Sequence, residues 1–270
     1  MNSTRVAHCA ELLSVAEAQK HTVAPLTELY ADLSVQEAYG VQQHNIRRRL
    51  SLGESIAGHK IGLTARAMQI KFSVNEPDYG HLLNTMFLED GATLDLTELV
   101  DPQIEVEPAF VLKKRLMGPN LKVADVIAAT DYVCVCFEVI DSRIEDWRIK
   151  LQDTVADNGS SARVVLGKQR FKPDSVKLDD LETTLEFDGV VVETGNSSAI
   201  LGHPANGIAW LGNTLAQFGV ALEPGHVVLP GTCTKSRRIF GHSQILGRMQ
   251  SIGDVSLVVT GRPAITKYKT

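Results

Sequence analysis

The chain has 270 residues, of which 44% are hydrophobic and 22% charged, so its composition is that of a folded globular protein and not of a collagen-like, mucin-like or disordered one. Its 27 lysine and arginine residues are outnumbered by 32 aspartate and glutamate residues, which gives a formal net charge of −5. Because nucleic-acid binding needs clustered positive charge, this balance argues against DNA as a partner.

The sequence also bears on location and redox state. No stretch approaches the roughly 18 consecutive apolar residues of a membrane-spanning helix. The first twenty residues mix acidic and polar residues with apolar ones, which predicts an amphipathic helix and no signal peptide. Four cysteines do not make a disulfide framework, and Cys134 and Cys136 lack the spacing of a redox or zinc site. We expect a cytoplasmic protein with reduced thiols, in which these two cysteines pack in the core.

Hydrophobic spacing predicts an α+β protein. Residues 10–50 have a helical pattern, and the Ser34-Val-Gln-Glu37 segment has capping-box spacing, so we expect an N-terminal helical cap over residues 1–55. Short apolar runs broken by Gly, Pro and Asp then predict a strand-rich body over residues 56–270. The expected strands cover residues 59–63, 93–96, 104–112, 132–140, 162–166, 185–192, 226–229 and 255–259. Helices are expected at 123–129 and 204–218, the second beginning at a Gly-His203-Pro entry. No internal repeat or linker divides the chain.

Glu105 and Glu107 are the first candidates for chemistry. In a strand, residues two apart point to the same face, so both carboxylates would project together while Ile104 and Val106 face the core. Such a pair could share one metal ion. The alternative is a solvated strand face with two ordinary surface glutamates, and the spacing of two residues leaves both interpretations open.

Glu138 is a candidate third ligand. Cys134, Cys136, Glu138 and Ile140 would share one strand face, which sets a carboxylate in an apolar row. A buried carboxylate needs a cation or a proton to offset its charge. Three convergent carboxylates suit a hard divalent ion such as Mg²⁺ or Mn²⁺.

Three further segments contain candidate polar groups. Lys60 lies in an apolar run flanked by glycines, where burial would lower its pKa and make it a proton-transfer or carboxylate-binding group; the alternative is a lysine that extends to solvent. Residues 75–80 read as a turn with Asp78 at its tip, and residues 153–161 as a short polar loop that offers hydroxyls and backbone donors. The chain has no Walker loop, GxGxxG, HExxH or GxSxG motif, so nucleotide-binding, zinc-protease and serine-hydrolase functions have no support.

Taken together, six segments resemble a known family. They are His59-Lys60-Ile-Gly-Leu-Thr64, Glu76-Pro-Asp78-Tyr-Gly80, Ile104-Glu105-Val-Glu107, and residues 138–147, 153–160 and 201–207. In this order and spacing they are similar to the 2-keto-4-pentenoate hydratase (2-hydroxypenta-2,4-dienoate hydratase) family of the fumarylacetoacetate hydrolase superfamily. The resemblance covers roughly residues 25–260.

This resemblance implies a fold and a site. The fold would be a mixed β-barrel-like body with an N-terminal helical part, assembled into homo-oligomers, often pentamers or decamers. Mg²⁺ or Mn²⁺ would be bound by three glutamates, which are Glu105, Glu107 and Glu138 in this sequence. Lys60 and Asp78 fall where the family has proton-transfer and substrate-positioning groups, and Ser160 falls in the substrate-facing loop.

The implied activity is that of a hydro-lyase in the catabolism of aromatic or ring-cleaved compounds. It would add water to a 2-hydroxy-2,4-dienoate (2-oxo-4-enoate) and form a 4-hydroxy-2-oxo acid. The metal would stabilise charge on the 2-oxygen, and Lys60 and Asp78 would share the acid and base roles without either being assigned. The rivals are a 4-oxalocrotonate decarboxylase of the same family, an acylpyruvate hydrolase and a non-catalytic metal-binding scaffold. The Ser142-Arg-Ile-Glu-Asp-Trp147 segment resembles the hydratase branch.

The sequence departs from the family pattern in two places. Pro108 follows the glutamate pair and lacks a backbone donor, which predicts an edge position or a bulge beside the metal site. Residues 231–242, which include Lys235, Arg237 and Arg238, are more basic than is usual in the family. We expect this segment to bind a second anionic group or another subunit, with a solvated loop as the alternative.

Overall fold

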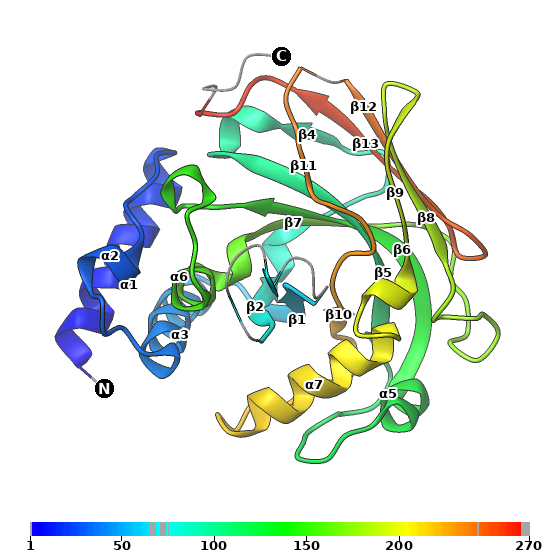
Figure 1. Ribbon diagram of the computed structural model, residues 1–270, viewed down its shortest axis with the longest axis horizontal. Helices are drawn as coiled ribbons and strands as arrows, with labels where there is room; N and C mark the ends of the chain where they lie inside the picture. The colour runs from blue at the N-terminus through cyan, green and yellow to red at the C-terminus, as the bar shows by residue number, and fades with distance from the viewer. Residues whose placement is uncertain (1, 65–68, 71–73, 75, 242, 266–270) are drawn as a thin grey trace.

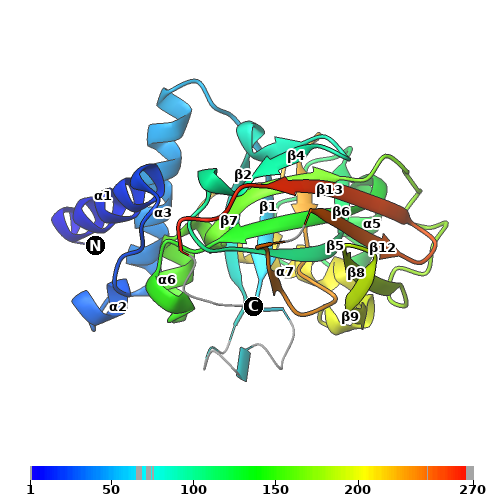
Figure 2. The same cartoon turned by 90° about the horizontal axis from the view of Figure 1, so that it is seen from above.

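The fold is α+β, as the sequence predicts, and its strands form a curled mixed sheet beside a group of helices (Figure 1). The computed structural model describes residues 2–64, 69–70, 74, 76–241 and 243–265. Seen from above, the N-terminal helices stand at one end of the molecule and the strands fill the rest (Figure 2). Within the described ranges, no helix has the length and apolar character needed to cross a membrane.

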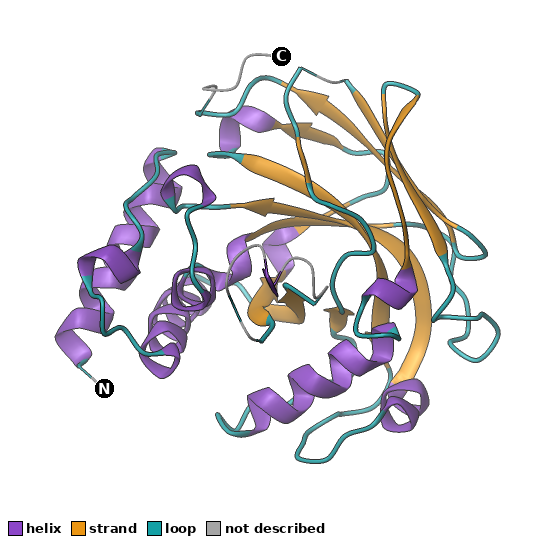
Figure 3. Ribbon diagram, in the orientation of Figure 1, coloured by secondary structure: helices purple, strands orange, loops and turns teal. Residues whose placement is uncertain are grey.

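The N-terminal helices form one side of the molecule (Figure 3). They are α1 (Ser3–Gln19), α2 (Leu26–Leu29) and α3 (Val35–Ser51), and the short α6 (Leu151–Ala156) packs against α3. The predicted capping box is confirmed, because Ser34 Oγ accepts a hydrogen bond from Glu37 N and the Glu37 carboxylate accepts one from Ser34 N. The cap positions α3 where Gln42 can donate hydrogen bonds to Tyr79 O and Val155 O.

The larger sheet holds most of the predicted strands. Its members are β1 (Ile56–Gly62), β2 (Asp78–Leu83), β3 (Phe87–Leu88), β5 (Pro102–Leu112), β6 (Thr130–Asp141), β7 (Ser161–Leu166), β10 (Val227–Leu229) and β11 (Arg237–Arg238). The order is β2-β1-β10-β5-β6-β7-β3, and β11 also pairs with β5. The β1–β10 and β3–β7 pairs are parallel and the other pairs are antiparallel, so the sheet is mixed.

A second sheet covers one face of the first. It contains β4 (Thr93–Asp95), β8 (Glu182–Phe187), β9 (Val190–Asn196), β12 (Gln244–Met249) and β13 (Gly253–Thr260), in the order β4-β13-β12-β8-β9. A Cβ on Gly247 of β12 would lie 2.7 Å from the ring of Phe137 in β6, so the two sheets are in direct contact at this glycine.

The two faces of β5 and β6 have different surroundings. Val106 and Phe137 belong to the main hydrophobic core between the sheets. On the opposite face, residues from five strands form a separate buried cluster that includes Leu82, Ala109, Cys134, Cys136, Val164 and Leu229. A flat sheet could not bring β2, β7 and β10 to one such cluster, so this face is the inside of the curl. Cys134 and Cys136 are buried there as free thiols, as expected.

The two helices predicted in the body are confirmed. They are α5 (Val123–Ala129) and α7 (Pro204–Ala216). His203 is the N-cap residue of α7, because its Nδ1 accepts a hydrogen bond from Ala205 N at 3.0 Å. This contact assigns His203 to helix entry, and Pro204 occupies the first helical turn, where its missing N–H has no cost.

Several predictions of local structure were wrong. Residues 78–80 are not a turn, since they begin strand β2 with Asp78 only 4% exposed, while Asn75 lies outside the described residues. Residues 153–161 are not an irregular loop, because they hold the end of α6, a 3₁₀ turn at Asn158–Ser160 and the first residue of β7. Residues 185–192 form a hairpin instead of one strand. Asp188 and Gly189 have φ values of 50° and 81° and make its two-residue turn.

Candidate metal and active site

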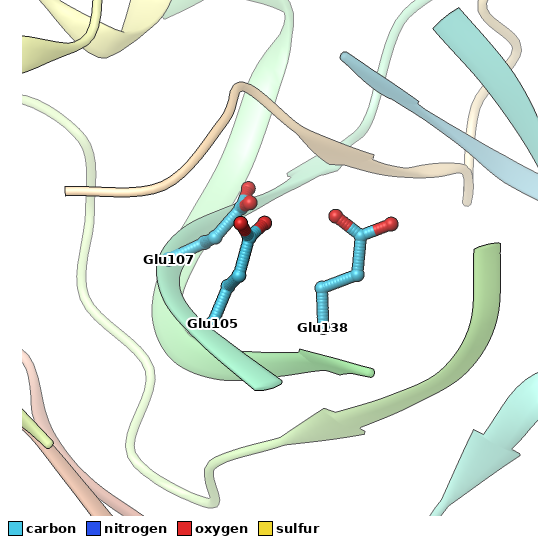
Figure 4. Close-up of side chains that lie close together, drawn as sticks. All are labelled: Glu105, Glu107 and Glu138. Atoms are coloured by element: carbon cyan, nitrogen blue, oxygen red, sulfur yellow. The ribbon is translucent and has the colours of Figure 1, made fainter. Parts of the chain in front are cut away.

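Three glutamates converge on the inner face of the curled sheet (Figure 4). Glu105 and Glu107 are two residues apart in β5, and Glu138 of β6 lies directly opposite Glu105 in the antiparallel register. One carboxylate oxygen from each lies within 4.8 Å of the other two. Glu107 and Glu138 are 0% exposed, so the alternative of a solvated strand face is wrong for this segment.

The protein partners of these carboxylates are few. Gly231 N donates a hydrogen bond to Glu107 Oε2 at 2.9 Å, and Ser161 Oγ donates a long one of 3.4 Å to Glu138 Oε1. Within the described part of the chain, Glu107 Oε1 and Glu138 Oε2 accept no hydrogen bond although both are buried. Orphaned carboxylate oxygens that face one another are costly unless a cation or protons neutralise them.

The same three carboxyl groups have raised pKa values. Burial, followed by repulsion from Glu138, raises the pKa of Glu105 to about 8. The pKa of Glu107 is raised well above its ordinary value by burial and by both neighbouring carboxylates, and burial also raises that of Glu138. A hard divalent cation would replace these protons, and three carboxylates on two adjacent strands supply the oxygen ligands that Mg²⁺ or Mn²⁺ prefers. The residues present therefore fit such an ion.

Lys60 lies beside this cluster and is 3% exposed. Its Nζ donates a hydrogen bond to Gly159 O at 2.9 Å, and lies 3.5 Å from Glu138 Oε1 and 3.8 Å from Asp78 Oδ1. Burial alone would lower its pKa, but the carboxylates of Glu138 and Asp78 outweigh burial and raise the pKa of Lys60 above its ordinary value. The expected depression of this pKa was wrong because the sequence does not show how many carboxylates surround the ammonium group.

The two oxygens of the Asp78 carboxylate have different surroundings. Thr154 Oγ1 of α6 donates a hydrogen bond of 2.6 Å to Asp78 Oδ2. Asp78 Oδ1 is buried and, among the residues that the structure describes, receives no hydrogen bond. Gly62, opposite Asp78 in the β1–β2 pair, makes room for this arrangement, because a Cβ there would lie 2.3 Å from Asp78 Oδ1. Asp78 Oδ1 thus faces the ammonium group of Lys60 at 3.8 Å.

These groups open onto a cavity of about 350 Å³, a size that holds a small organic acid. Its lining includes Lys60, Gly62, Thr64, Asp78, Gln103, Glu105, Ile140, Asp146, Trp147, Ile149, Thr154, Gly159, Ser160, Thr232, Thr234, Ser236 and Arg238. Ser160, with φ of 58°, lies in this lining and donates a hydrogen bond to Asp157 Oδ2 at 3.3 Å. The structure thus brings Lys60, Asp78, Ser160 and Glu105 to one cavity, with Glu107 and Glu138 beside Glu105.

Other predicted features have structural roles. The pair Arg143–Asp157, 2.6 Å apart and buried, links the segment after β6 to the end of α6. Asp153 accepts hydrogen bonds from Thr27 N and Thr27 Oγ1, which tie α6 to α2. The acidic residues of the predicted polar loop therefore position Thr154 and Ser160, and their own side chains do not line the cavity.

The expectation that Pro108 lies at a sheet edge or in a bulge was wrong. Strand β5 lies in the middle of the sheet, and the register with β6 runs through Pro108 opposite Val135 without a bulge. On its other side, β5 pairs with β10 at residues 110–111 and with β11 at residues 103–104. Among the described strands none pairs with Pro108 on that side, so its missing N–H costs no ladder hydrogen bond.

Reasoning from the sequence missed several cavity residues. Thr154, Gln103 and Ser236 were not singled out, and Trp147 was named only within a motif. Gln103 precedes Glu105 by two residues, so the period of a strand was a signal that it shares the carboxylate face. Ser236 donates a hydrogen bond of 2.7 Å to Gln103 Oε1 across 133 positions of sequence, and no local pattern predicts that contact.

Comparison with known proteins identifies similar chains. A family model described as fumarylacetoacetate (FAA) hydrolase C-terminal matches residues 54–260. A 2-hydroxypent-2,4-dienoate hydratase from Pseudomonas putida is 45% identical over 222 residues, which is 82% of this chain and 100% of the relative. A 2-oxo-hept-4-ene-1,7-dioate hydratase from Escherichia coli is 41% identical over 84% of this chain and 87% of its own length.

A solved structure matches over nearly the full length. The 4-oxalocrotonate decarboxylase from Pseudomonas putida G7, complexed with magnesium and adipate, superposes with a TM-score of 0.93 at 35% identity. The match covers 96% of this chain and 99% of that one. Hydratases and a decarboxylase therefore share this fold with the chain.

Proposed function

Because the chain belongs to the fumarylacetoacetate hydrolase family, we propose that it is a divalent-metal-dependent lyase that adds water to a 2-hydroxy-2,4-dienoate and releases a 4-hydroxy-2-oxo acid. Hydratase relatives at 45% and 41% identity support this reaction. The observation that carries the proposal is the buried Asp78 Oδ1, which lies 3.8 Å from Lys60 Nζ and accepts no hydrogen bond from the described residues, because a hydration needs a group that holds and deprotonates water.

Glu105, Glu107 and Glu138 would hold the Mg²⁺ or Mn²⁺ ion, as their convergent oxygens and raised pKa values support. When bound, the cation supplies electrostatic stabilisation of the negative charge that the 2-oxygen of the substrate acquires. Gly231 N and Ser161 Oγ would keep two of the carboxylates oriented.

Lys60 and Asp78 would move the protons. In the first step the 2-hydroxyl loses its proton and C5 gains one, so the dienol becomes a 2-oxo-3-enoate. In the second step the oxygen of water bonds to C4 and a proton bonds to C3, which leaves the 4-hydroxy-2-oxo acid. We assign Lys60 Nζ, an ammonium donor, to protonation at carbon, and Asp78 Oδ1, a carboxylate acceptor, to the water. Thr154 holds the other Asp78 oxygen and so aims Oδ1. Ser160, in the cavity lining, would contact the substrate.

A decarboxylation of a 4-oxalocrotonate-type 2-oxo acid is the second candidate. The specific observation in its favour is the near-complete structural match with the decarboxylase, at a TM-score of 0.93. The two reactions share the same carboxylate and 2-oxo group and differ in the bond that changes. Decarboxylation has no use for a water-binding base, so Asp78 Oδ1, which accepts no hydrogen bond from the described residues, weighs toward hydration.

The test uses chelator-stripped protein and 2-hydroxypenta-2,4-dienoate. Loss of the dienol absorbance should require added Mg²⁺ or Mn²⁺, and the product should gain one water, with deuterium at C3 and C5 when the reaction runs in D₂O. The same preparation is given 4-oxalocrotonate, and release of carbon dioxide in place of hydration would favour the second candidate. Metal binding without turnover of any oxo acid would favour a non-catalytic metal-binding scaffold.

That the chain forms a homo-oligomer stays a prediction. The family that the sequence resembles often forms pentamers or decamers. Val190 and Val191 are 65% and 52% exposed on β9, the edge strand of the second sheet. Exposed apolar residues on an edge strand support association with another subunit. Sedimentation velocity of the purified protein measures the assembly directly.

A further inference from the structure

The turn between α6 and β7 has an uncommon backbone. Asn158, Gly159 and Ser160 have φ values of 57°, 60° and 58°, so three consecutive residues lie in the left-handed region. Residues other than glycine rarely adopt this region, and asparagine is one of the exceptions. Such backbone persists where the surrounding structure fixes it, and it is common at functional sites. Contacts outside the turn must therefore stabilise it.

The side chain of Asn158 fixes the turn to strand β2. His81 N donates a hydrogen bond of 2.8 Å to Asn158 Oδ1, and Asn158 Nδ2 donates one of 2.9 Å to His81 O. In the described part of the chain, β2 is an edge strand of the larger sheet, so these two backbone groups face no neighbouring strand. The carboxamide has both a donor and an acceptor and occupies the place of that strand.

The turn lies directly beside Lys60. Gly80 of β2 is opposite Lys60 in the β1–β2 register, and a Cβ on Gly80 would lie 2.2 Å from Asn158 O. The missing side chain lets the turn approach the strand pair at this point. A Cβ on Gly159 would lie 3.0 Å from Lys60 Cδ, so this glycine also permits a close approach. The backbone of the turn therefore packs against the stem of Lys60.

Gly159 O is the nearest described partner of the Lys60 ammonium group. It accepts a hydrogen bond of 2.9 Å, whereas Glu138 Oε1 and Asp78 Oδ1 lie 3.5 Å and 3.8 Å from Nζ. An ammonium group and a carboxylate in a direct hydrogen bond approach to about 2.7–2.9 Å. The Gly159 carbonyl group therefore holds the ammonium group short of both carboxylates and fixes its place in the cavity.

We propose that Asn158 is a positioning residue for Lys60. Its carboxamide fixes the turn on β2, and Gly159 O of that turn holds the ammonium group where it can give a proton to the substrate carbon. Gly159 and Ser160 line the cavity but Asn158 does not, so Asn158 acts through its neighbours. The inference rests on the proposed function, in which Lys60 is the proton donor to carbon. Loss of the carboxamide should slow proton transfer while the metal site and substrate binding persist.

A second asparagine provides a matched control. Asn158→Gly removes both hydrogen bonds to His81 and leaves the left-handed backbone accessible. The Asn213 carboxamide also accepts a hydrogen bond from one backbone N–H, Leu121 N at 2.8 Å, and donates one to the carbonyl of the same residue at 3.2 Å. Asn213 lies on α7, outside the cavity lining. Asn213→Ala should therefore lower the melting temperature without lowering kcat.

The experiment combines two substitutions and measures the Mg²⁺-dependent hydration of 2-hydroxypenta-2,4-dienoate. In the otherwise unmodified protein, N158G should lower kcat about 10- to 100-fold and change KM by less than about twofold, as expected for a displaced proton donor. In K60M, N158G should change kcat by less than about twofold, because no ammonium group is left to position. A merely structural role of Asn158 would lower kcat in both backgrounds.

Calorimetry with Mn²⁺ checks the fold, and the affinity of N158G should stay within about threefold of that of the unmodified protein. If N158G does not bind Mn²⁺, N158D takes its place with the same expectations, since aspartate also adopts the left-handed region and keeps the acceptor for His81 N.

Two results would overturn the inference and leave the proposed function standing. One is an equal loss of kcat in K60M and in the otherwise unmodified protein, and the other is full activity of the Asn158 variant. Absence of hydration by the unmodified protein in the presence of Mg²⁺ would overturn the proposed function and this inference with it.

Discussion

Lys60 Nζ lies 3.5 Å from Glu138 Oε1 while Glu138 Oε2, on the same carboxylate, has no hydrogen-bond partner among the described residues. Lysine thus balances one side of a glutamate whose other side faces Glu105 and Glu107. A single ammonium group cannot neutralise three carboxylates, so a metal ion and Lys60 would share the task. Removal of the Lys60 ammonium group is therefore expected to strengthen metal binding and to weaken catalysis.

Replacement of Lys60 by Met should lower kcat by about 1,000-fold, the usual range for loss of a general acid. The same variant should bind Mn²⁺ about tenfold more tightly or better, because a positive charge near the ion has been removed. Calorimetry with Mn²⁺ and steady-state kinetics measure both effects. Weaker Mn²⁺ binding in K60M would show that Lys60 instead supports the ion.

The pKa of Glu105, raised to about 8 by burial and Glu138, predicts a pH dependence of metal binding. The protein must release this proton to bind the ion, and protonated Glu107 would add a second one, so Mn²⁺ affinity should rise at least tenfold per pH unit up to about pH 8. Since the folded-state pKa exceeds the ordinary value, the metal-free protein should lose stability as the pH rises through about 8. Melting temperatures from pH 6 to 9, with and without Mn²⁺, test both statements.

Glu105→Gln is the control for this behaviour, since it keeps the size of the side chain and removes its titration. The variant should show a smaller fall in metal-free stability between about pH 5 and 8, the range between the ordinary and the folded-state pKa of Glu105. An identical pH profile in E105Q would assign the dependence to another group.

Thr154→Val should lower kcat about tenfold while KM changes little, because Asp78 would lose the 2.6 Å hydrogen bond that fixes its position. Thr154→Ser keeps the hydroxyl and should retain most of the activity. A variant that merely weakened α6 would lower the melting temperature in both cases. Equal activity of T154V and T154S would therefore remove the positioning role.

Burial of His59 should make the stability of the folded protein depend on pH. It is buried, and neither ring nitrogen has a hydrogen-bond partner in the described part of the chain. Burial, together with His81 and His226 at ring-centroid distances of 4.9 Å and 5.5 Å, lowers its pKa well below the ordinary value. Because the folded-state pKa of His59 is depressed, protonation favours the unfolded chain. The folded protein therefore loses stability as the pH falls below the ordinary pKa of histidine.

At one pH unit below the ordinary pKa of histidine, the free energy of unfolding is lower by about 1.4 kcal/mol. His59→Leu should remove it, so the unfolding free energy of H59L should fall less between pH 7.5 and 5.5, as measured by urea denaturation. His44→Gln, at an exposed position of α3, is the control. A steeper pH dependence in H59L than in the unmodified protein would contradict this account.

Local patterns in the sequence determined much of the architecture. The capping box at Ser34 and Glu37, the helix entry at His203 and the alternation along β5 and β6 depend on neighbours within a few residues, so they could be predicted. The shared face of Glu105 and Glu107 followed from the two-residue period of a strand. The family resemblance correctly implied the fold, and it proposed Lys60, Asp78 and Ser160.

Only the tertiary structure decided how these residues meet. Asp78 reads locally as a turn residue, yet pairing of β2 with β1 buries it beside Lys60. The pKa of Lys60 depends on carboxylates from β2, β5 and β6, and Arg238 reaches the cavity because β11 pairs with β5 across 135 positions at Arg238 and Gln103. Contacts between distant segments depend on sheet register and curl, which the short-range pattern of a sequence does not contain.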